Sequence, residues 1–243
     1  MLPKMGAGQA RGTANWTNDS VAAFAGDDRI AATLLQAAAV TNAAISEPSP
    51  QYLPPFPTPI LLTSIGNNGF AILGDLAGDE AGISVAGAGD VNGDGIADFI
   101  VGARGNDAGG DGAGAVYVIF GRTGAYASLD LTNLAATDGF RILGDAPGDA
   151  AGTSAASAGD INGDGYADII VGARFNDSGG TDAGAAYVIF GHSGAFGTID
   201  LGALPASAGF KIQGDLAGDQ AGFSVASAGD VHGDGYADIL IGA

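Results

Sequence analysis

A short acidic segment occurs three times in this 243-residue chain, and its residue types can bind a metal ion. The copies read GDVNGDGIAD from Gly89, GDINGDGYAD from Gly159 and GDVHGDGYAD from Gly229. A hard cation such as Ca²⁺ takes about six to eight oxygen ligands, and alternate side chains of one loop provide them compactly. Glycines let the backbone fold closely around the ion. The three segments therefore predict three calcium loops, one ion each.

The predicted ligands stand at positions 1, 3, 5, 7 and 9 of each loop, and position 7 contributes its backbone carbonyl. In the third loop a neutral imidazole offers nitrogen where a hard cation prefers oxygen, so this site is expected to bind calcium most weakly. Replacing that histidine by asparagine is expected to strengthen it. The ligand sets are Asp90, Asn92, Asp94, Ile96 and Asp98; Asp160, Asn162, Asp164, Tyr166 and Asp168; and Asp230, His232, Asp234, Tyr236 and Asp238.

Two other interpretations of these loops are less favourable. An EF-hand requires glutamate at position 12 and flanking helices, but position 12 is Val101, Val171 or Ile241 and the flanks read as strands. Asn-Gly and Asp-Gly also form ordinary hairpin turns. A turn does not require carboxylates at positions 1, 5 and 9 of all three copies, so a short calcium loop inside a β-hairpin is preferred.

A second acidic motif precedes each loop: GDLAGDEAG from Gly74, GDAPGDAAG from Gly144 and GDLAGDQAG from Gly214. Asp75 and Asp79 are four residues apart and could form a secondary cation site. Turns in which aspartate side chains cap backbone amides explain the same residues and are the preferred interpretation.

Composition restricts the function classes. Eight Lys and Arg against 27 Asp and Glu give a net charge of −19, which argues against nucleic acid or anionic lipid as partners. With 47% hydrophobic residues the chain can still bury a core. The absence of cysteine excludes disulfides and zinc–thiolate sites. No apolar stretch of about 18 residues predicts a membrane span, and the N-terminus lacks the apolar region of a signal peptide.

The whole chain after about residue 66 repeats with one period. The acidic loops start at Asp90, Asp160 and Asp230, so the copies are 70 residues apart. Short apolar runs bounded by Gly, Asp and Asn predict four strands in each copy, which is the content of a β-propeller blade. FIVGA and AVYVIF lack alternation, so both faces of these strands should be buried. The predicted strands of the first copy lie near Ile83–Ala88, Phe99–Ala103, Ala115–Phe120 and Phe140–Leu143, and the predicted blades at about 70–143, 144–213 and 214–243, the last incomplete.

The N-terminal part has a different pattern. Residues 1–60 are expected to stand apart from the repeat, and residues 1–46 to form a separate segment. Ile30, Leu34 and Leu35 have roughly helical spacing, which predicts a short helix at about 27–44. Prolines make residues 47–65 a semi-rigid linker before the repeats at 66–243.

The repeats resemble the FG-GAP repeats of the integrin α-subunit propeller and its bacterial relatives. The matching residues are SVAGAGDVNGDGIADFIVGA from Ser84 and GAGAVYVIFG from Gly112, and both later copies follow them. The resemblance implies an all-β, seven-bladed β-propeller with structural calcium in hairpin loops on one face and ligand contacts on the opposite face. The Phe-Gly pair of the family is replaced by Ala81-Gly82, and Gly-Ala-Pro by Gly-Ala-Arg at Arg104.

The expected function is a calcium-stabilised, extracellular or cell-surface module for adhesion, binding a protein or glycan, with further blades outside this sequence and no membrane insertion. Alternatives are an accessory propeller of a secreted hydrolase, as in phosphatidylinositol-glycan-specific phospholipase D, or a purely structural repeat of a large secreted adhesin. Catalysis is not expected. His192 and His232 are the only histidines, and His192 and Ser193 are neighbours on an extended segment, so their side chains point apart.

Overall fold

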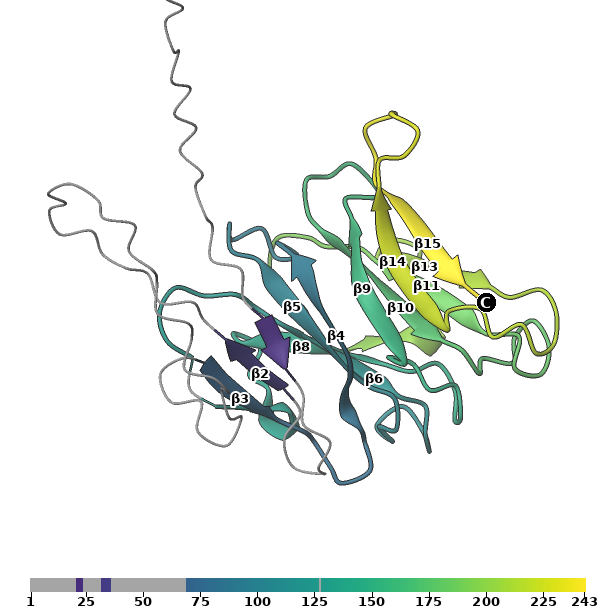
Figure 1. Cartoon of the computed structure of the whole chain (residues 1–243), viewed down its shortest axis with the longest axis horizontal. Helices are drawn as coiled ribbons and strands as arrows, with labels where there is room; N and C mark the ends of the chain where they lie inside the picture. Colours follow the sequence, from purple (N-terminus) through teal and green to yellow (C-terminus); the bar gives the residue numbers. More distant parts are fainter. Residues whose placement is uncertain (1–20, 24–31, 36–68, 127) are drawn as a thin grey trace, which may run out of the picture.

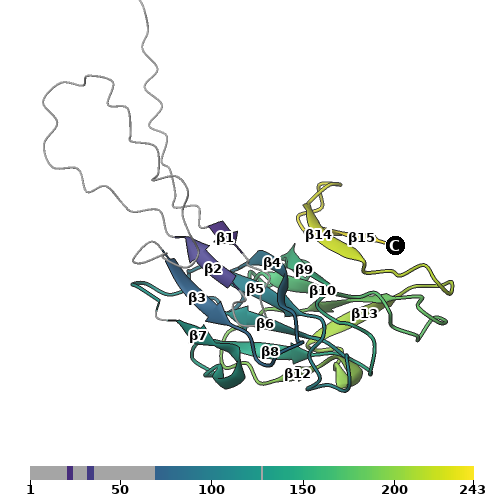
Figure 2. The same cartoon turned by 60° about the horizontal axis from the view of Figure 1, so that its bottom comes forward.

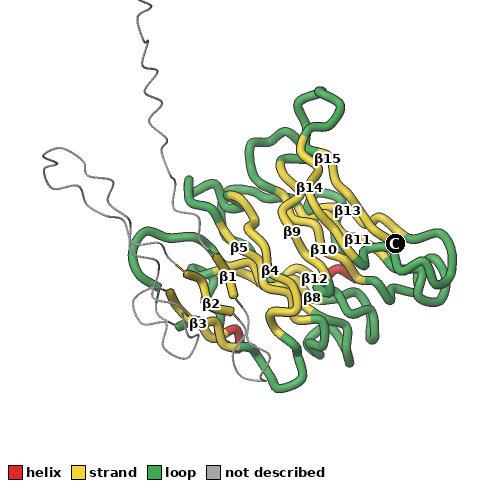
Figure 3. The backbone as a smooth tube through the Cα atoms, viewed as in Figure 1, coloured by secondary structure: helices red, strands yellow, loops and turns green. Residues whose placement is uncertain are grey.

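The computed structural model describes residues 21–23, 32–35, 69–126 and 128–243, and the structural statements below concern these residues. They form strands joined by turns and loops, with no α-helix in this part of the chain (Figures 1 and 3). The 3-10 helices η3 (Leu131–Asn133) and η4 (Leu201–Ala203) are one turn each. The described residues contain no helix that is long and apolar enough to cross a bilayer. The predicted all-β class is confirmed.

Antiparallel sheets repeat along the chain with the predicted period. Blade 1 has the strand order β4-β5-β6-β8, blade 2 has the order β9-β10-β11-β13, and the hairpin β14–β15 begins blade 3. The four strands predicted for the first copy are therefore confirmed. The bounds are β4 (Ala81–Gly89), β5 (Asp98–Ala103), β6 (Ala115–Ile119), β8 (Gly139–Leu143), β9 (Ser154–Gly159), β10 (Asp168–Ala173), β11 (Ala185–Ile189), β13 (Gly209–Gln213), β14 (Ser224–Gly229) and β15 (Asp238–Gly242).

A further sheet precedes blade 1. It is formed by β1 (Val21–Ala23), β2 (Ala32–Leu35) and β3 (Gly69–Leu73), with β7 (Leu129–Asp130) at its edge. The pairs Leu34–Phe70 and Leu35–Gly69 repeat the register of Val118–Phe140 and Ile119–Gly139 in blade 1. The sheet thus has the strand pairing of a blade. Since β3 belongs to it, the sheet of blade 1 begins at Ala81 rather than near residue 70.

Two expectations for the N-terminal part are wrong where the structure describes it. Strand β2 lies inside the segment predicted as a helix at 27–44, and β1 and β2 join a blade-like sheet although residues 1–60 were expected to stand apart. A short alanine-rich segment can form a helix or a strand. Here β2 forms a strand because it pairs with the edge of β3. The other residues of the predicted helix, and the predicted linker at 47–65, lie outside the described residues.

Neighbouring blades are also joined at their outer edges. The loop between β6 and β8 contains β7, which pairs in parallel with β3 of the preceding sheet. The equivalent β12 (Ile199–Asp200) pairs in parallel with β8. Aromatic rings from the same segments also stack on each other. The ring centroids of Phe70 and Tyr126 are 4.2 Å apart, and those of Phe140 and Phe196 are 4.3 Å apart. The repeated Gly-Phe pair therefore supplies a ring that holds a loop of the next blade.

The inner strands β4, β9 and β14 lie side by side, so that the blades face one another (Figures 1 and 2). Every residue of β6, β10 and β11 is buried, as the sequence predicted for strands covered on both faces. One core cluster contains Ile100 and Val118 of blade 1 together with Ile169 and Val171 of blade 2. The core is therefore built between blades rather than within each one.

Glycine and serine make the contact between the blades. The hydroxyl of Ser84 in blade 1 donates to the carbonyl oxygen of Gly152 at the start of blade 2, at 2.9 Å. A Cβ atom on Gly102 would overlap that same carbonyl oxygen. Blade 2 repeats the contact towards blade 3, where Ser154 donates to Gly222 at 2.8 Å. The glycine of the VGA sequence is thus required because the backbones of adjacent blades touch.

We expect Gly102→Ala to destabilise the protein by about 2–3 kcal/mol, because the added Cβ meets backbone that can yield only if the blades separate. The matched control is Gly87→Ala on β4, where an added Cβ meets no atom within 4 Å. This control should be neutral or slightly stabilising, since alanine loses less chain entropy than glycine. Urea unfolding measures both, and equal effects of the two variants would contradict the proposed contact.

Candidate metal centre

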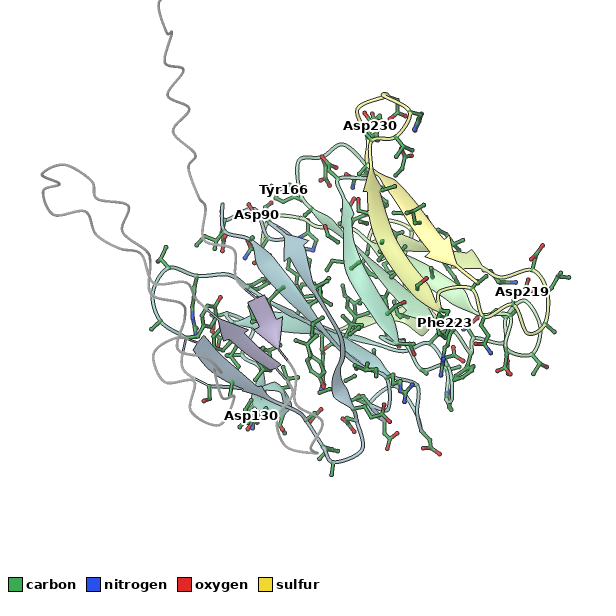
Figure 4. All side chains as sticks on the ribbon, in the orientation of Figure 1. Asp90, Asp130, Tyr166, Asp219, Phe223 and Asp230 are labelled. Carbon is green, nitrogen blue, oxygen red and sulfur yellow. The ribbon has the colours of Figure 1, made fainter. Side chains whose placement is uncertain are left out.

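The three acidic loops are hairpin turns at one end of the blades. Loop 1 (residues 90–98) connects β4 to β5, loop 2 (160–168) connects β9 to β10, and loop 3 (230–238) connects β14 to β15. Figure 4 shows Asp90, Tyr166 and Asp230, one from each loop, at the same end of the molecule, and Asp219 and Phe223 away from it. The predicted strand flanks are confirmed, and they exclude the helix–loop–helix geometry of an EF-hand.

In loop 1 the carboxylate of Asp90 organises the backbone. Its Oδ1 accepts from the amides of Gly93 at 2.8 Å and Asp94 at 3.0 Å, and its Oδ2 accepts from Gly95 at 2.8 Å. The amide of Asp94 also donates to Oδ1 of Asn92 at 2.9 Å. The side chains at positions 1, 3 and 5 are therefore gathered over the same few peptide groups.

Loops 2 and 3 repeat this arrangement around their first aspartates. Asn162 also accepts from the amide of Asp164 at 2.9 Å, as Asn92 does in loop 1. The amides that donate to the first aspartate are those of Gly163 (2.7 Å), Asp164 (3.1 Å) and Gly165 (2.9 Å) for Asp160, and those of Gly233 (2.6 Å), Asp234 (3.2 Å) and Gly235 (2.9 Å) for Asp230.

Two glycines in each loop have backbone angles that other residues adopt only with strain. Gly93 has φ of 74° and Gly95 has φ of 85°, and their counterparts in loops 2 and 3 have the same sign. In this left-handed region a Cβ atom approaches the following carbonyl oxygen. The spacing of the glycines is therefore set by the curvature of the loop, as the sequence indicated.

The last aspartate of loop 1 is buried and connects the loop to the outer half of the blade. Asp98 is only 2% exposed, and its Oδ2 accepts from the amide of Val91 at 2.9 Å. Its Oδ1 accepts from the amide of Gly121, just after β6, at 2.8 Å. Asp168 makes the equivalent bonds with Ile161 and Gly191, at 2.8 and 2.9 Å. Sequence reasoning missed these glycine donors, although they recur with the 70-residue period.

The charges of loops 1 and 2 are suited to a cation. Burial raises the pKa of Asp98, two backbone hydrogen bonds oppose this, and the negative charges of Asp94 and Asp90 raise it further. Burial likewise raises the pKa of Asp168. Of the salt bridges in the described residues, none reaches a carboxylate of loop 1 or loop 2. Asp90, Asn92, Asp94 and Asp98, with their loop 2 counterparts, offer only oxygen ligands, the type that calcium prefers. Among the described residues, the three aspartates of neither loop bring one carboxylate oxygen each within 4.8 Å of one another.

Loop 3 differs because its histidine contacts two carboxylates. Nε2 of His232 lies 2.9 Å from Oδ2 of Asp234, and Nδ1 lies 2.9 Å from Oδ2 of Asp238. The hydrogen bond to Asp238 and the charge of Asp234 raise the pKa of His232. The Val231 amide and His232 in turn lower the pKa of Asp238. The predicted ligands at positions 3, 5 and 9 are therefore brought together, but with a ring nitrogen in place of an amide oxygen.

Adjacent loops contact each other. The ring of Tyr166 lies against Gly93, where an added Cβ would overlap it, and the amide of Ala167 donates to the carbonyl oxygen of Asp90 at 3.0 Å. The same pair of contacts joins loop 3 to loop 2, through Tyr236 on Gly163 and through the bond from Ala237 to Asp160 at 3.0 Å. The loops thus form a continuous row in which the position-7 tyrosines of loops 2 and 3 each cover the loop before them.

The second acidic motif forms a buried side-chain network. Asn106 Nδ2 donates to Asp79 and lies 3.4 Å from Oδ2 of Asp75, which accepts from the Tyr117 hydroxyl at 3.0 Å. The Asp79 carboxyl also has a backbone hydrogen bond with Leu76 in the same turn, so the expected capping is present there and side-chain donors from β6 and the β5–β6 loop are added to it. In blade 2 the network also includes the ammonium group of a lysine side chain. Its members are Asp145, Asp149, Asn176 and Tyr187, with Lys211 Nζ 2.9 Å from Asp145.

His192 has a structural environment. Its ring stacks on Phe196 with centroids 4.0 Å apart, and its Nδ1 lies 2.9 Å from the backbone carbonyl of Ser193 rather than from the hydroxyl. In blade 1, Arg122 occupies the same position and lies over Tyr126 at 4.3 Å. The residue therefore covers an aromatic ring of the β6–β8 or β11–β13 loop.

Repeated four-stranded sheets, packed through their inner strands and each carrying an acidic hairpin loop, define a repeat protein built from propeller-type blades. The family model described as FG-GAP repeat matches residues 81–119 and 151–189, which contain the three inner strands of blades 1 and 2. The chain thus carries FG-GAP repeats, and the resemblance seen in the sequence is confirmed.

The chain is also similar to integrin α chains. It is 30% identical over 171 residues to Integrin alpha-PS5 of Drosophila melanogaster, which covers 70% of this chain and 15% of that protein. It is 34% identical over 160 residues to Integrin alpha-7 of Mus musculus, covering 63% of this chain and 11% of that protein. The chain therefore spans only a small part of the length of these relatives.

One aspartate of each buried network has a shifted pKa, and the two shifts are in opposite directions, so lowering the pH should change the stability of the protein in opposite senses through the two residues. Burial raises the pKa of Asp79 above its usual 3.8, so the native state takes up a proton before the unfolded state as pH falls. Wild type should therefore gain stability relative to Asp79→Asn as pH falls from 7 through this raised pKa. Burial also acts on Asp145, but the Tyr187 hydrogen bond and Lys211 outweigh it and lower its pKa.

For Asp145 the sign is reversed, because its stabilising contribution is present above pH 3.8 and is lost as pH falls through the lowered pKa. As pH falls below 3.8 through this lowered pKa, wild type should lose stability relative to Asp145→Asn. Unfolding free energies of the three proteins, measured from pH 7 to pH 3, give both differences. Parallel pH profiles for all three would show that neither carboxylate is perturbed.

Proposed function

We propose that this chain is part of a calcium-binding β-propeller module that acts outside the cell and binds a protein or glycan ligand. The observation that carries the proposal is the buried carboxylate of Asp98, repeated at Asp168. Each lies beside the other carboxylates of its loop, without a salt bridge to a basic side chain of the described residues. A divalent cation bound in the loop compensates these charges, and the carboxylates of the loop supply its oxygen ligands by closing around it.

In this proposal calcium is structural. Asp98 is bonded both to its own loop and to Gly121 beyond β6, so an ion on this carboxylate fixes the β4–β5 hairpin against the outer half of blade 1. Contacts between loops carry the effect to the next blade, through Tyr166 and Gly93. The ion therefore stabilises the register of the hairpins and their stacking rather than activating a water molecule.

The ligand is proposed to bind at the end of the blades opposite the acidic loops. Similarity to integrin α chains supports this role, and the family resemblance implies that ligands contact that face. The loop after β13 lies away from the acidic loops, as the positions of Asp219 and Phe223 in Figure 4 indicate. We propose no catalytic role, in keeping with the packing of His192 on Phe196.

Further blades are proposed to pack against blade 3. Ile100 and Ile170 are fully buried by the next blade, whereas the equivalent Leu240 is 59% exposed. Phe140 is 4% exposed beneath Phe196 of the next repeat, and the equivalent Phe210 is 40% exposed. This surface has the apolar residues of an interface between blades, so a further repeat of the same kind is the partner that fits it.

We expect calcium to raise the melting temperature of the full chain. At a concentration about 100-fold above Kd, one site that binds only the native state adds about 2.7 kcal/mol, which corresponds to roughly 5–10 °C for a chain of this size. Asp94→Asn with Asp164→Asn should remove most of this increase, because each loop then loses its position-5 carboxylate. Calorimetry in calcium and in chelator measures the effect.

The matched control is Asp111→Asn, which changes an exposed aspartate of the β5–β6 loop. It should keep the full calcium increment. An unchanged melting temperature of wild type in millimolar calcium would overturn the assignment of loops 1 and 2, and equal losses in the control would show that only net charge matters.

A further inference from the structure

Loop 3 brings together two carboxylates and one imidazole, a combination that loops 1 and 2 lack. One ligand atom each from Asp230, His232 and Asp238 lie within 4.8 Å of one another. In the part of the chain that the structure describes, this is the one set of His, Cys, Asp or Glu side chains that meets this spacing. It combines two carboxylates with one imidazole, and borderline divalent ions such as Zn²⁺ prefer that combination over the all-oxygen set of calcium.

The orientation of the ring is fixed by a fourth residue. Nε2 of His232 lies 2.9 Å from Oδ2 of Asp234, which is not a member of the cluster. When Nε2–H donates to this carboxylate, Nδ1 presents its lone pair towards Asp238, 2.9 Å away. A carboxylate that holds the remote N–H of a ligating histidine is the usual support of a histidine–metal bond.

The backbone and solvent access also favour a site here. Asp230 accepts the same three amide bonds as its counterparts, so a histidine at position 3 is compatible with this loop backbone. The side chain of His232 is 59% exposed and that of Asp238 is 27% exposed, so an ion reaches the ligand atoms from solvent. Two ligand atoms of a tetrahedral zinc site lie about 3.4 Å apart, so the separation of 2.9 Å between Nδ1 and Asp238 must widen only slightly.

We propose that loop 3 is a site for a borderline divalent transition ion, with zinc as its representative, held by Asp230, Nδ1 of His232 and Asp238. Asp234 is a positioning residue that holds the ring. The inference rests on the proposed function in so far as both assign cations to these loops, but it gives loop 3 a different ion from loops 1 and 2. The chain then holds two classes of cation in one row of loops.

The test titrates the full chain, freed of metal by chelator, with Zn²⁺ and with Ca²⁺ in separate calorimetric experiments. Wild type should bind one Zn²⁺ at least 10-fold more tightly than loop 3 binds Ca²⁺. His232→Asn restores the loop 1 pattern, and it should lose at least 10-fold in Zn²⁺ affinity and gain Ca²⁺ binding in loop 3. The visible spectrum of the Co²⁺-loaded protein should show nitrogen and oxygen ligation that this variant loses.

Two matched variants separate loop 3 from other sources of zinc binding. Asn162→His writes the loop 3 pattern into loop 2, and it should add a second Zn²⁺ site. His192→Ala removes the other histidine and should leave the Zn²⁺ titration unchanged. Circular dichroism confirms that each variant keeps the wild-type fold.

The outcomes are distinguishable from those of the proposed function. Zinc binding that is unaffected in His232→Asn, or lost in His192→Ala, overturns the loop 3 site whether or not calcium binds elsewhere. Three calcium sites without any zinc preference also overturn it, and leave the proposed function intact. Zinc bound by loop 3 in a chain whose loops 1 and 2 take no calcium supports the inference and defeats the proposed function.

Discussion

The close approach of neighbouring backbones is the constraint on which the rest of the structure depends. Gly102 lies against the carbonyl of Gly152, and Ser84 bonds to that same oxygen. Because the inner strands meet through backbone and small side chains, the large apolar residues of β5, β6, β10 and β11 can fill the space between blades. This packing also sets where the hairpin ends lie, so the acidic loops form a row. Glycines such as Gly102 are therefore required by the interface between blades.

The acidic loops have an electrostatic cost that follows from this packing. The row of loops places Ala167 on the carbonyl of Asp90 and buries Asp98 beneath the turn after β6. A buried carboxylate beside two others is unfavourable unless hydrogen bonds and a cation compensate it. The hydrogen bonds are present in both complete blades, and they come from backbone amides that stay in place whatever the ion does. They hold the carboxylates where a cation can use them, so a single ion can act on both the hairpin and the blade edge.

The sequence predicted most of the repeat correctly because each feature is local. Apolar runs between Gly and Asp gave the strands, and glycines in left-handed conformations marked the loops. Features that depend on contacts between distant residues could not be found in this way. The amide of Gly121 reaches Asp98, and Asn106 and Tyr117 reach Asp75, only because the sheet folds them together. The residues Ala32–Leu35 have a pattern that fits a helix or a strand, and their pairing with the edge of β3 makes them a strand. Asp75, Asn106 and Tyr117 recur 70 positions later as Asp145, Asn176 and Tyr187, and this recurrence is the signal of the network in the sequence.

In the three loops, the residue that fixes the backbone is not the residue to which we assign the choice of ion. The loop amides donate to Asp230 as they do to Asp90 and Asp160, although loop 3 lacks the bond that Asn92 and Asn162 accept at position 3, so the turn tolerates a change at this position. Position 3 can therefore change from asparagine to His232 without loss of the fold. The same independence holds at position 7, where Ile96, Tyr166 or Tyr236 is accepted and the ring of the last two covers the preceding loop. If the proposed cation sites are correct, a repeat protein of this kind can vary the ion of one blade while its stacking stays constant, because position 3 would select the ion and position 7 makes the contact between loops.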